Sequence, residues 1–322
     1  MKISQVFPVL KPNKPKDSVS SYRPVSVSNN FLKIFESILY NQLNAFITNN
    51  AIIPETQYGF KTGISTGHQL IDLIYDFTIA FNDKNLISID IIFLDYSNAF
   101  DVVNHNILFN ELYEIGIRNN ALKLLTNLLL NRKQFVSYEN NKSFEYDITS
   151  GVIQGGTLSA LLFNIYVRNI VKVIKFSSIK QFADDIVIYK LIYENSDSLK
   201  LQTDLESIYK WSTDYKLKLN PLKSKHMNIT QKTLTDVSIY YINSQRIPTV
   251  ENQKHLGIIF DNKLSFNEHT DYVYKNSMRK WTTIKRLCPF ANQKIFLNLY
   301  KTYILPLIEY SYFAWIPNKT QT

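Results

Sequence analysis

Apolar side chains recur at helical spacing over much of the chain and predict a series of amphipathic helices. The first is expected to begin after Ser28 or Asn29, which are typical capping residues, and to end before Pro54. The spacing predicts helices at residues 31–47, 66–81, 106–115, 121–130 and 197–215. A further helix is predicted to begin at about residue 157, and helical periodicity returns over residues 266–322. Runs rich in β-branched and aromatic residues predict strands at residues 86–94, 134–140, 144–150 and 254–266, and two more within residues 179–191.

The run IKQFADDIVIYKL, at residues 179–191, interrupts its apolar pattern with two adjacent acidic residues. Strand-forming residues on both sides predict a hairpin with Asp184 and Asp185 at its tip. Two neighbouring carboxylates repel each other unless a divalent cation keeps both ionised. Oxygen ligands without nearby His or Cys favour Mg²⁺ or Mn²⁺ over zinc. The alternative is that the pair is ordinary polar turn chemistry.

A third carboxylate follows another buried strand. The apolar run LISIDIIFL at residues 86–94 ends at Asp95, which is poorly placed for packing and well placed to meet the hairpin tip across a sheet. Three such carboxylates could hold two metal ions roughly 3.5–4 Å apart. Phosphoryl or nucleotidyl transfer is the chemistry that such a pair of ions serves.

The composition is that of a globular, basic protein. Its 322 residues, 45% of them hydrophobic, can bury a core large enough for two or three subdomains. A formal net charge of +9 with 21 Tyr and 20 Phe suits a polyanion whose bases can stack on aromatic rings. An acidic membrane surface is the competing partner, but no run of about 18 apolar residues predicts a membrane span. The single cysteine, Cys288, excludes an internal disulfide, and an intracellular, reducing location fits.

Two segments near the N-terminus combine cations with chain-breaking residues. Residues 8–24 hold four prolines together with Arg23, and predict an extended basic arm that either contacts nucleic acid or is a solvated linker. Residues 58–70 place Lys61 among glycines before a helix, an arrangement that can grip phosphate. A plain loop is the equal alternative there.

A glycine-rich loop and a basic C-terminal region are further candidates for ligand contact. In GVIQGG, at residues 151–156, Gln154 can bond a base or a sugar, and glycines such as Gly155 let the backbone lie close to a ligand. The C-terminal helical region carries cations that include Arg279 and Lys285.

Several sequence blocks follow one another along the chain: SSYRPVSV, YGFKTGIST, FLDYSNAFDVVNH, GVIQGGTLSALLFNIYV, QFADD, LKLNPLKS and HLGIIFDNKLSF. In this order they resemble the reverse transcriptase domain of non-LTR retrotransposons of the LINE type, and Jockey-like ones in particular. The resemblance runs nearly end to end, so a chance match of one motif does not explain it.

The resemblance implies an α+β, right-hand polymerase. Fingers are expected at residues 1–85, a palm with an antiparallel sheet at residues 86–265, and a partial helical thumb at residues 266–322. The rest of the fingers would be an insertion at about residues 117–150. The implied activity is that of an RNA-directed DNA polymerase, a nucleotidyltransferase that extends a DNA primer with dNTPs on an RNA template. Such an enzyme is expected to work in a nuclear or cytoplasmic ribonucleoprotein.

The resemblance also assigns roles around the carboxylates. Asp95, Asp184 and Asp185 are implied to be catalytic and to bind two Mg²⁺ ions, with Mn²⁺ as a substitute and the carbonyl of Tyr96 as a further ligand. Phe100 falls where the family places the bulky residue that excludes a ribose 2′-hydroxyl. Without the resemblance, Phe100 would be assigned to the core.

Further positions match family motifs that contact substrate. Gln154 matches a glutamine beside the nascent base pair, and Lys223 matches a lysine that assists the leaving pyrophosphate. The implied dNTP-binding residues are Lys61, Phe100, Gln154 and Lys223. The implied nucleic-acid-binding residues are Arg23, Gly155, Arg279 and Lys285.

The chain departs from the family pattern in two motifs. Lys61 and Ile64 stand where many relatives carry arginines, which removes the bidentate fork that grips phosphate. Ile153, Gly156 and Ala160 replace residues of the glycine-rich motif, and loop rigidity is expected to fall. The family's upstream endonuclease is expected to be missing from this chain. A truncated, inactive remnant that only binds nucleic acid is therefore the alternative function, and a metal-dependent nuclease is a weaker third.

Overall fold

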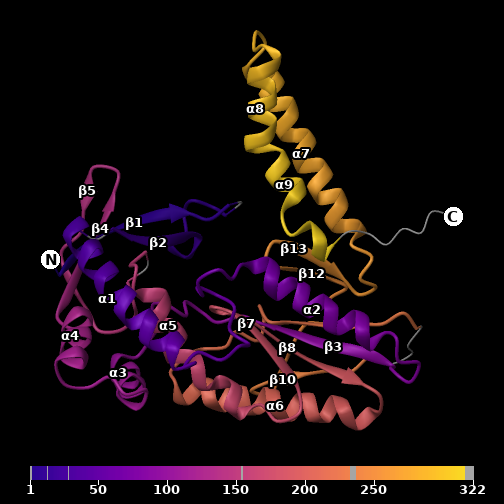
Figure 1. Ribbon diagram of the computed structural model, residues 1–322, viewed down its shortest axis with the longest axis horizontal. Helices are drawn as coiled ribbons and strands as arrows, with labels where there is room; N and C mark the ends of the chain where they lie inside the picture. The colour runs from indigo at the N-terminus through magenta and orange to yellow at the C-terminus, as the bar shows by residue number, and fades with distance from the viewer. Residues whose placement is uncertain (1, 13, 28, 154, 233–236, 316–322) are drawn as a thin grey trace. The chain divides into compact units, whose positions relative to one another are not determined.

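The computed structural model describes residues 2–12, 14–27, 29–153, 155–232 and 237–315. The chain divides into two compact units, each assembled from separate stretches of sequence (Figure 1). We call one the loop unit, which comprises Met1–Phe60, Tyr96–Lys175 and Ser207–Asn220. We call the other the carboxylate unit, which comprises Lys61–Asp95, Phe176–Glu206 and Pro221–Thr322.

The carboxylate unit is built on a four-stranded sheet in which all neighbouring strands are antiparallel. The strand order is β7 (Ser178–Phe182), β8 (Asp185–Ile192), β3 (Ser88–Leu94) and β9 (Lys225–Ile229). Every residue of β3 is buried, which explains why its sequence is a continuous apolar run rather than an alternating one. The strands predicted at residues 86–94 and 179–191 are confirmed, and so is the α+β class.

Helices lie on both faces of this sheet. Helix α2 (Thr66–Ala80) buries Leu70, Leu73 and Phe77 in one core cluster with Ile91 of β3. The first part of α6 (Asn195–Asp214) runs along the opposite face in Figure 1. Both helices fall where the apolar spacing predicts them.

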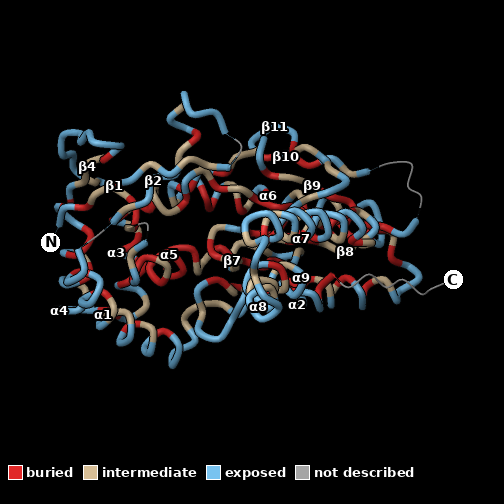
Figure 2. The backbone as a smooth tube through the Cα atoms, turned by 90° about the horizontal axis from the view of Figure 1, so that it is seen from above, coloured by how far each residue is buried: buried red, intermediate tan, exposed pale blue. Residues whose placement is uncertain are grey.

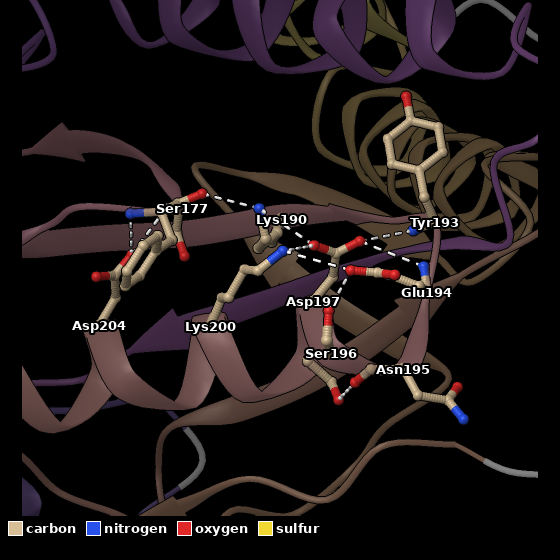
Figure 3. A network of polar contacts seen from close by, with 11 residues as sticks. Ser177, Lys190, Tyr193, Glu194, Asn195, Ser196, Asp197, Lys200 and Asp204 are labelled. Atoms are coloured by element: carbon tan, nitrogen blue, oxygen red, sulfur yellow. Dashed lines mark hydrogen bonds and ion pairs between the residues drawn. The ribbon is translucent and has the colours of Figure 1, made fainter.

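Two carboxylates of α6, one in its first turn and one near its middle, fasten the helix to the ends of β7 and β8 (Figure 3). Asp197 accepts hydrogen bonds from the backbone N–H groups of Tyr193 and Glu194 at 3.0 and 3.3 Å. Asp204 accepts two more, at 2.8 and 2.7 Å, from the backbone just before β7. Backbone donors that strand pairing does not use are satisfied in this way. The β7–β8 hairpin is therefore anchored at the end opposite its acidic tip.

Short ribbons and C-terminal helices complete the carboxylate unit. The ribbons pair β10 (Tyr241–Ile242) with β11 (Gln245–Arg246), and β12 (Asn252–His255) with β13 (Ile258–Asp261), both antiparallel. The helices are α7 (Asn267–Leu287), α8 (Gln293–Tyr303) and α9 (Leu305–Glu309), followed by the 3₁₀ turn Tyr312–Ala314. Figure 2 shows α7 and α8 largely in the colour of exposed residues. The segment at residues 254–266, predicted as one strand and a turn, holds the end of β12, a turn and all of β13. The helical C-terminal segment is confirmed over the described residues, and residues 316–322 lie outside them.

The loop unit contains a five-stranded sheet. Its strands are β1 (Ile3–Leu10), β2 (Tyr22–Val27), β4 (Arg132–Tyr138), β5 (Asn141–Lys142) and β6 (Tyr146–Ile148). β1 pairs with β2 antiparallel and with β4 parallel, and β4 also pairs antiparallel with β5 and β6.

The prediction of an extended basic arm at residues 8–24 is wrong. Pro8 and Pro24 are opposite each other in the β1–β2 ladder, and the pairing of β1 with β4 covers only Ile3 to Val6. Proline is tolerated because Pro24 lies on an edge strand and Pro8 lies beyond the parallel ladder. The four prolines therefore mark a hairpin and its turn, which includes the 3₁₀ turn Val19–Ser21.

The helices of the loop unit are α1 (Asn30–Asn49), α3 (His105–Glu114), α4 (Asn119–Leu129) and α5 (Ser159–Val167), followed by the 3₁₀ segment Arg168–Val173. The predicted start of α1 is confirmed, since the Asn29 side chain accepts a hydrogen bond from the Phe31 N–H at 2.9 Å. The prediction that α5 is amphipathic is wrong: every residue of α5 except Ala160 is buried (Figure 2). Among the described residues, we find no helix with the length and apolar character needed to cross a bilayer.

Candidate active site

Strand register places two of the predicted carboxylates beside each other. In the antiparallel pair of β3 and β8, Leu94 is opposite Ile186. Asp95 follows Leu94 and Asp185 precedes Ile186, so the two aspartates occupy facing positions where the strands end. Facing residues of antiparallel strands have Cα atoms about 4.5–5.5 Å apart. A carboxylate at the end of an apolar strand thus meets the hairpin, as predicted.

The third carboxylate lies in the hairpin turn. Phe182 of β7 pairs with Asp185 of β8, which leaves Ala183 and Asp184 as the connecting residues. Ala183 adopts a left-handed conformation with φ of +57°, which is uncommon for a residue with a side chain. The predicted hairpin is confirmed, with the refinement that Asp185 is the first residue of a strand.

Burial disfavours ionisation of all three carboxyls, and repulsion by neighbouring carboxylates adds to this effect at Asp184 and Asp185. Withdrawal from water raises the pKa of Asp185 to about 6, with added contributions from the charges of Asp184 and Asp95. Desolvation also raises the pKa of Asp184, and the Asp95 charge acts in the same direction. Desolvation raises the pKa of Asp95 against the opposing effect of the Lys223 ammonium. The influence of Asp95 on both other aspartates indicates that the three charges lie within range of one another.

Asp95 presents a carboxylate oxygen that suits a divalent cation. Its Oδ1 is buried and accepts no hydrogen bond within the described part of the chain, while the Lys223 Nζ lies 3.9 Å from that oxygen. The backbone N–H of Asp95 donates to Ser224 Oγ at 3.2 Å and fixes the strand end. A buried oxygen that no hydrogen bond satisfies, close to two other carboxylates, fits a hard cation that takes oxygen ligands. As the side chains stand, the described residues hold no group of three or more His, Cys, Asp or Glu close enough to bind a metal ion.

The loop unit presents Phe100 beside the glycine-rich loop. The Phe100 ring stacks on Phe163 of α5, with centroids 4.4 Å apart, and meets Phe60 edge-on at 6.3 Å. Its backbone carbonyl accepts a hydrogen bond from the Val152 N–H at 2.9 Å. The ring is only partly buried, so the residue belongs to an aromatic cluster and also has an accessible face.

The glycine-rich loop packs closely against neighbouring backbone. At Gly151, with φ of +89°, a Cβ atom would lie 2.7 Å from the carbonyl oxygen of Asp101. At Gly155, with φ of +92°, it would lie 3.4 Å from the carbonyl oxygen of Ser26. Glycine is required at both positions because the left-handed conformation disfavours other residues. Gln154 lies outside the described residues.

The other predicted site residues lie on separate elements of the two units. Tyr96 buries its side chain and its hydroxyl bonds to Ser212 at 2.8 Å. Arg23 is exposed on β2, and Lys61 lies in the turn before α2. The remaining two, Arg279 and Lys285, are exposed on α7, where the Lys285 ammonium lies 4.9 Å from the Trp281 ring centroid.

Sequence reasoning missed three charged residues that are buried in the structure. Glu36 on α1, Asp90 on β3 and Lys180 on β7 are each at most 6% exposed. Asp90 accepts hydrogen bonds from Asn228 and Tyr240, and Lys180 forms ion pairs with two aspartates of α2. The available signal was a charged residue at an apolar position of a helix or strand pattern, which requires a buried partner.

A family model matches most of the chain. The model described as "Reverse transcriptase (RNA-dependent DNA polymerase)" matches residues 11–260. This region includes the strands β3, β7, β8 and β9 and all three carboxylates.

Curated relatives match along nearly the whole chain. The chain is 28% identical over 307 residues to the "Probable RNA-directed DNA polymerase from transposon BS" of Drosophila melanogaster, a match that covers 92% of this chain and 33% of the relative. It is 26% identical to the corresponding X-element protein of the same organism, a match that covers 98% of this chain and 35% of the relative. It is 24% identical to the "RNA-directed DNA polymerase from mobile element jockey" of Drosophila funebris, a match that covers 96% of this chain and 34% of the relative. The chain thus spans about a third of the length of these relatives.

Solved structures of telomerase share the fold. An apo telomerase from Candida tropicalis, truncated from its C-terminal domain, matches 81% of this chain and 53% of that chain, with a TM-score of 0.52 and 14% identity. A telomerase from Candida albicans in complex with a telomeric RNA fragment matches 100% of this chain and 56% of that chain, with the same TM-score and 13% identity. At this identity the likeness concerns the fold alone.

Proposed function

The chain belongs to the reverse transcriptase (RNA-dependent DNA polymerase) family, and we propose that it is itself an RNA-directed DNA polymerase. It would extend the 3′-hydroxyl of a DNA primer with dNTPs on an RNA template. The observation that carries the proposal is the register of β3 and β8, which places Asp95 opposite Asp185 with Asp184 in the adjoining turn. Carboxylates gathered in this way suit nucleotidyl transfer.

The fold is that of a right-hand polymerase, as the family and the telomerase structures indicate. Within it, we propose fingers at residues 1–85, with a further part at about residues 117–150. We assign residues 86–265 otherwise to the palm, which contains the antiparallel sheet with the carboxylates. Residues 266–322 would be part of a helical thumb.

Members of the family generally use divalent metal ions, and we propose two Mg²⁺ ions here, with Mn²⁺ as a substitute. Asp95, Asp184 and Asp185 would hold them, with the Tyr96 carbonyl as a further ligand. When bound, the ions would supply activation of the attacking hydroxyl and neutralisation of the leaving pyrophosphate. The buried Oδ1 of Asp95, which accepts no hydrogen bond from a described residue, and the raised pKa values of the carboxyls support this ligand set.

Residues around the carboxylates would bind and orient the substrates. In the carboxylate unit, Lys223 has an exposed ammonium near Asp95 and would neutralise phosphate charge, and Lys61 would face the triphosphate. In the loop unit, Phe100 would exclude the ribose 2′-hydroxyl and Gln154 would lie beside the new base pair. The residues proposed to contact template or primer are Arg23, Gly155, Arg279 and Lys285. The expected setting is a ribonucleoprotein in the nucleus or cytoplasm.

Primer extension tests the proposal. Purified protein with poly(rA)/oligo(dT), dTTP and Mg²⁺ is expected to extend the primer, and Asp184→Asn is expected to lower the rate by about a thousandfold, because ligation of the ions is worth several kcal/mol. The matched control is Asp271→Asn, which removes an exposed carboxylate from α7 and should leave the rate unchanged. Extension that survives Asp184→Asn would refute the assignment. Template binding without extension by the wild-type protein would instead support the inactive remnant.

A further inference from the structure

A fully buried carboxylate on α1 lies at the glycine-rich loop. Glu36 is 0% exposed, and its Oε2 accepts a hydrogen bond from the Thr157 N–H at 3.0 Å. The backbone N–H of Leu158 interacts with the same carboxylate and stabilises its charged form. These two residues immediately precede α5, so the Glu36 side chain caps that helix from another element.

The loop is shaped around this carboxylate. A Cβ atom on Gly156 would lie 3.1 Å from the Glu36 Oε2 and 2.7 Å from the Ser159 Oγ. Gly156 does not have a left-handed backbone in this structure, so its lack of a side chain is explained by space rather than by conformation. The glycine at this position therefore complements the buried acid.

Burying the Glu36 carboxylate is energetically costly. Burial raises the pKa of Glu36, and the buried Arg132 guanidinium only partly offsets that effect. The other carboxylate oxygen, Oε1, is buried and accepts no hydrogen bond from any residue that the structure describes. Buried polar groups of this kind are usually exchanged for apolar ones unless they fix a specific arrangement.

The start of α5 controls the position of Phe100. Helix α5 has no side-chain cap of its own at Leu158, and negative charge at a helix N-terminus is favourable. Phe163, one turn into α5, stacks on the Phe100 ring with centroids 4.4 Å apart. The loop also bonds to the Phe100 carbonyl through the Val152 N–H. A shift of the loop would therefore move the ring.

We propose that Glu36 is a positioning residue for nucleotide selection. Its carboxylate fixes residues 155–158 and the start of α5, and through Phe163 it sets the position of the Phe100 ring that would meet the sugar of the incoming nucleotide. The inference rests on the proposed polymerase function, since it names a residue that tunes the selectivity of that activity.

The kinetic test compares Glu36→Ala with two matched variants. Glu36→Gln keeps an acceptor oxygen for the Thr157 N–H. Leu43→Ala removes a buried side chain two turns further along the same helix. Glu36→Ala is expected to raise the KM for dTTP and to lower the preference for dTTP over UTP, each by about tenfold, because a charge-assisted hydrogen bond is lost. Glu36→Gln should retain most of the selectivity for dTTP over UTP. Leu43→Ala should lower the Tm and leave that selectivity unchanged.

Hydrogen exchange separates failure of this inference from failure of the polymerase assignment. Amides of residues 157–167 are expected to exchange faster in Glu36→Ala than the loss of stability alone explains, whether or not the protein polymerises. Leu43→Ala should accelerate them only as far as it lowers the stability of the loop unit. Unchanged exchange and unchanged dTTP selectivity in Glu36→Ala would overturn the positioning role. If the wild-type protein does not extend primers, the polymerase assignment fails, and the exchange rates alone decide whether Glu36 orders the loop.

Discussion

The two units of the molecule hold their candidate site residues in different ways. In the carboxylate unit, Asp95 and Asp185 are placed by the pairing of buried strands. In the loop unit, the glycine-rich loop is held by single contacts, such as the hydrogen bond from the Gly151 N–H to the Val103 carbonyl at 2.8 Å and the bond from Thr157 to Glu36. Register is difficult to alter, because a slip of one residue moves every side chain of a strand to the other face. A contact between one side chain and a loop can be changed alone.

This difference predicts different roles for the site residues of the two units. Groups that carry the reaction benefit from placement by a sheet, since small errors in position are costly in rate. Groups that select a substrate can be placed by adjustable contacts. We therefore expect substitutions in the sheet to affect stability or abolish turnover, and substitutions around the loop to change selectivity.

The largest stability effect is expected in the core under the carboxylates. Ile91 of β3 is fully buried in the cluster with α2, so Ile91→Ala should lower the free energy of unfolding by about 2–5 kcal/mol, measured by urea titration. The ladder between β3 and β8 does not depend on that side chain, and primer extension well below the melting temperature should persist.

The matched variant in the loop unit is Leu108→Ala on α3, which is also fully buried and should cost a similar amount. Each variant is expected to accelerate amide exchange mainly in its own unit. Equal acceleration in both units would show that they unfold together, and the contrast between them would then not extend to stability.

The pH dependence of stability offers a second, smaller effect. Burial lowers the pKa of His255 to about 4, in a setting formed by Phe93, Phe260 and the Gln69 side chain. The unfolded chain binds this proton at a higher pH than the folded one, so the stability present above about pH 6.5 is lost as the pH falls toward 4. The loss should be on the order of 3 kcal/mol.

His255→Gln isolates this contribution, because the difference between wild type and variant removes the titration of the acidic residues. Urea unfolding at several pH values should show a shallower decline for the variant between about pH 6.5 and 4. Parallel curves for the two proteins would contradict the assignment of a neutral, buried His255.

Much of the carboxylate unit could be predicted from sequence because its signals are local. The apolar run before Asp95 and the strand-forming residues around Asp184 are enough to predict buried strands and a hairpin. The register that brings Asp95 to Asp185 is a tertiary fact, and only the chemical argument for a shared metal site anticipated it. The ladder of β1 and β4 was not predicted, because parallel pairing of distant segments leaves no mark in either one.

The burial of certain charged residues was also not predicted from the sequence. Glu36 lies within the apolar spacing of residues 31–47 and Asp90 lies inside the run at 86–94, yet both were absorbed into a packing pattern. A pattern of apolar positions identifies which face is buried, and it does not identify the partner that a charged residue on that face requires. The complete burial of α5 was missed for the related reason that periodicity cannot separate a half-buried helix from one enclosed on all sides.

The last test of the contrast between the two units measures how Phe100 affects the choice between dTTP and UTP. Phe100→Val should leave extension with dTTP nearly intact and increase the use of UTP by about 10–100-fold, because a smaller side chain no longer clashes with a 2′-hydroxyl. Phe60→Val is the matched control, since Phe60 belongs to the same cluster but meets Phe100 only edge-on. Steady-state kinetics with each nucleotide measures the ratio. If both variants lower activity with dTTP and UTP equally, Phe100 contributes packing alone, and selection must lie with groups placed by the sheet.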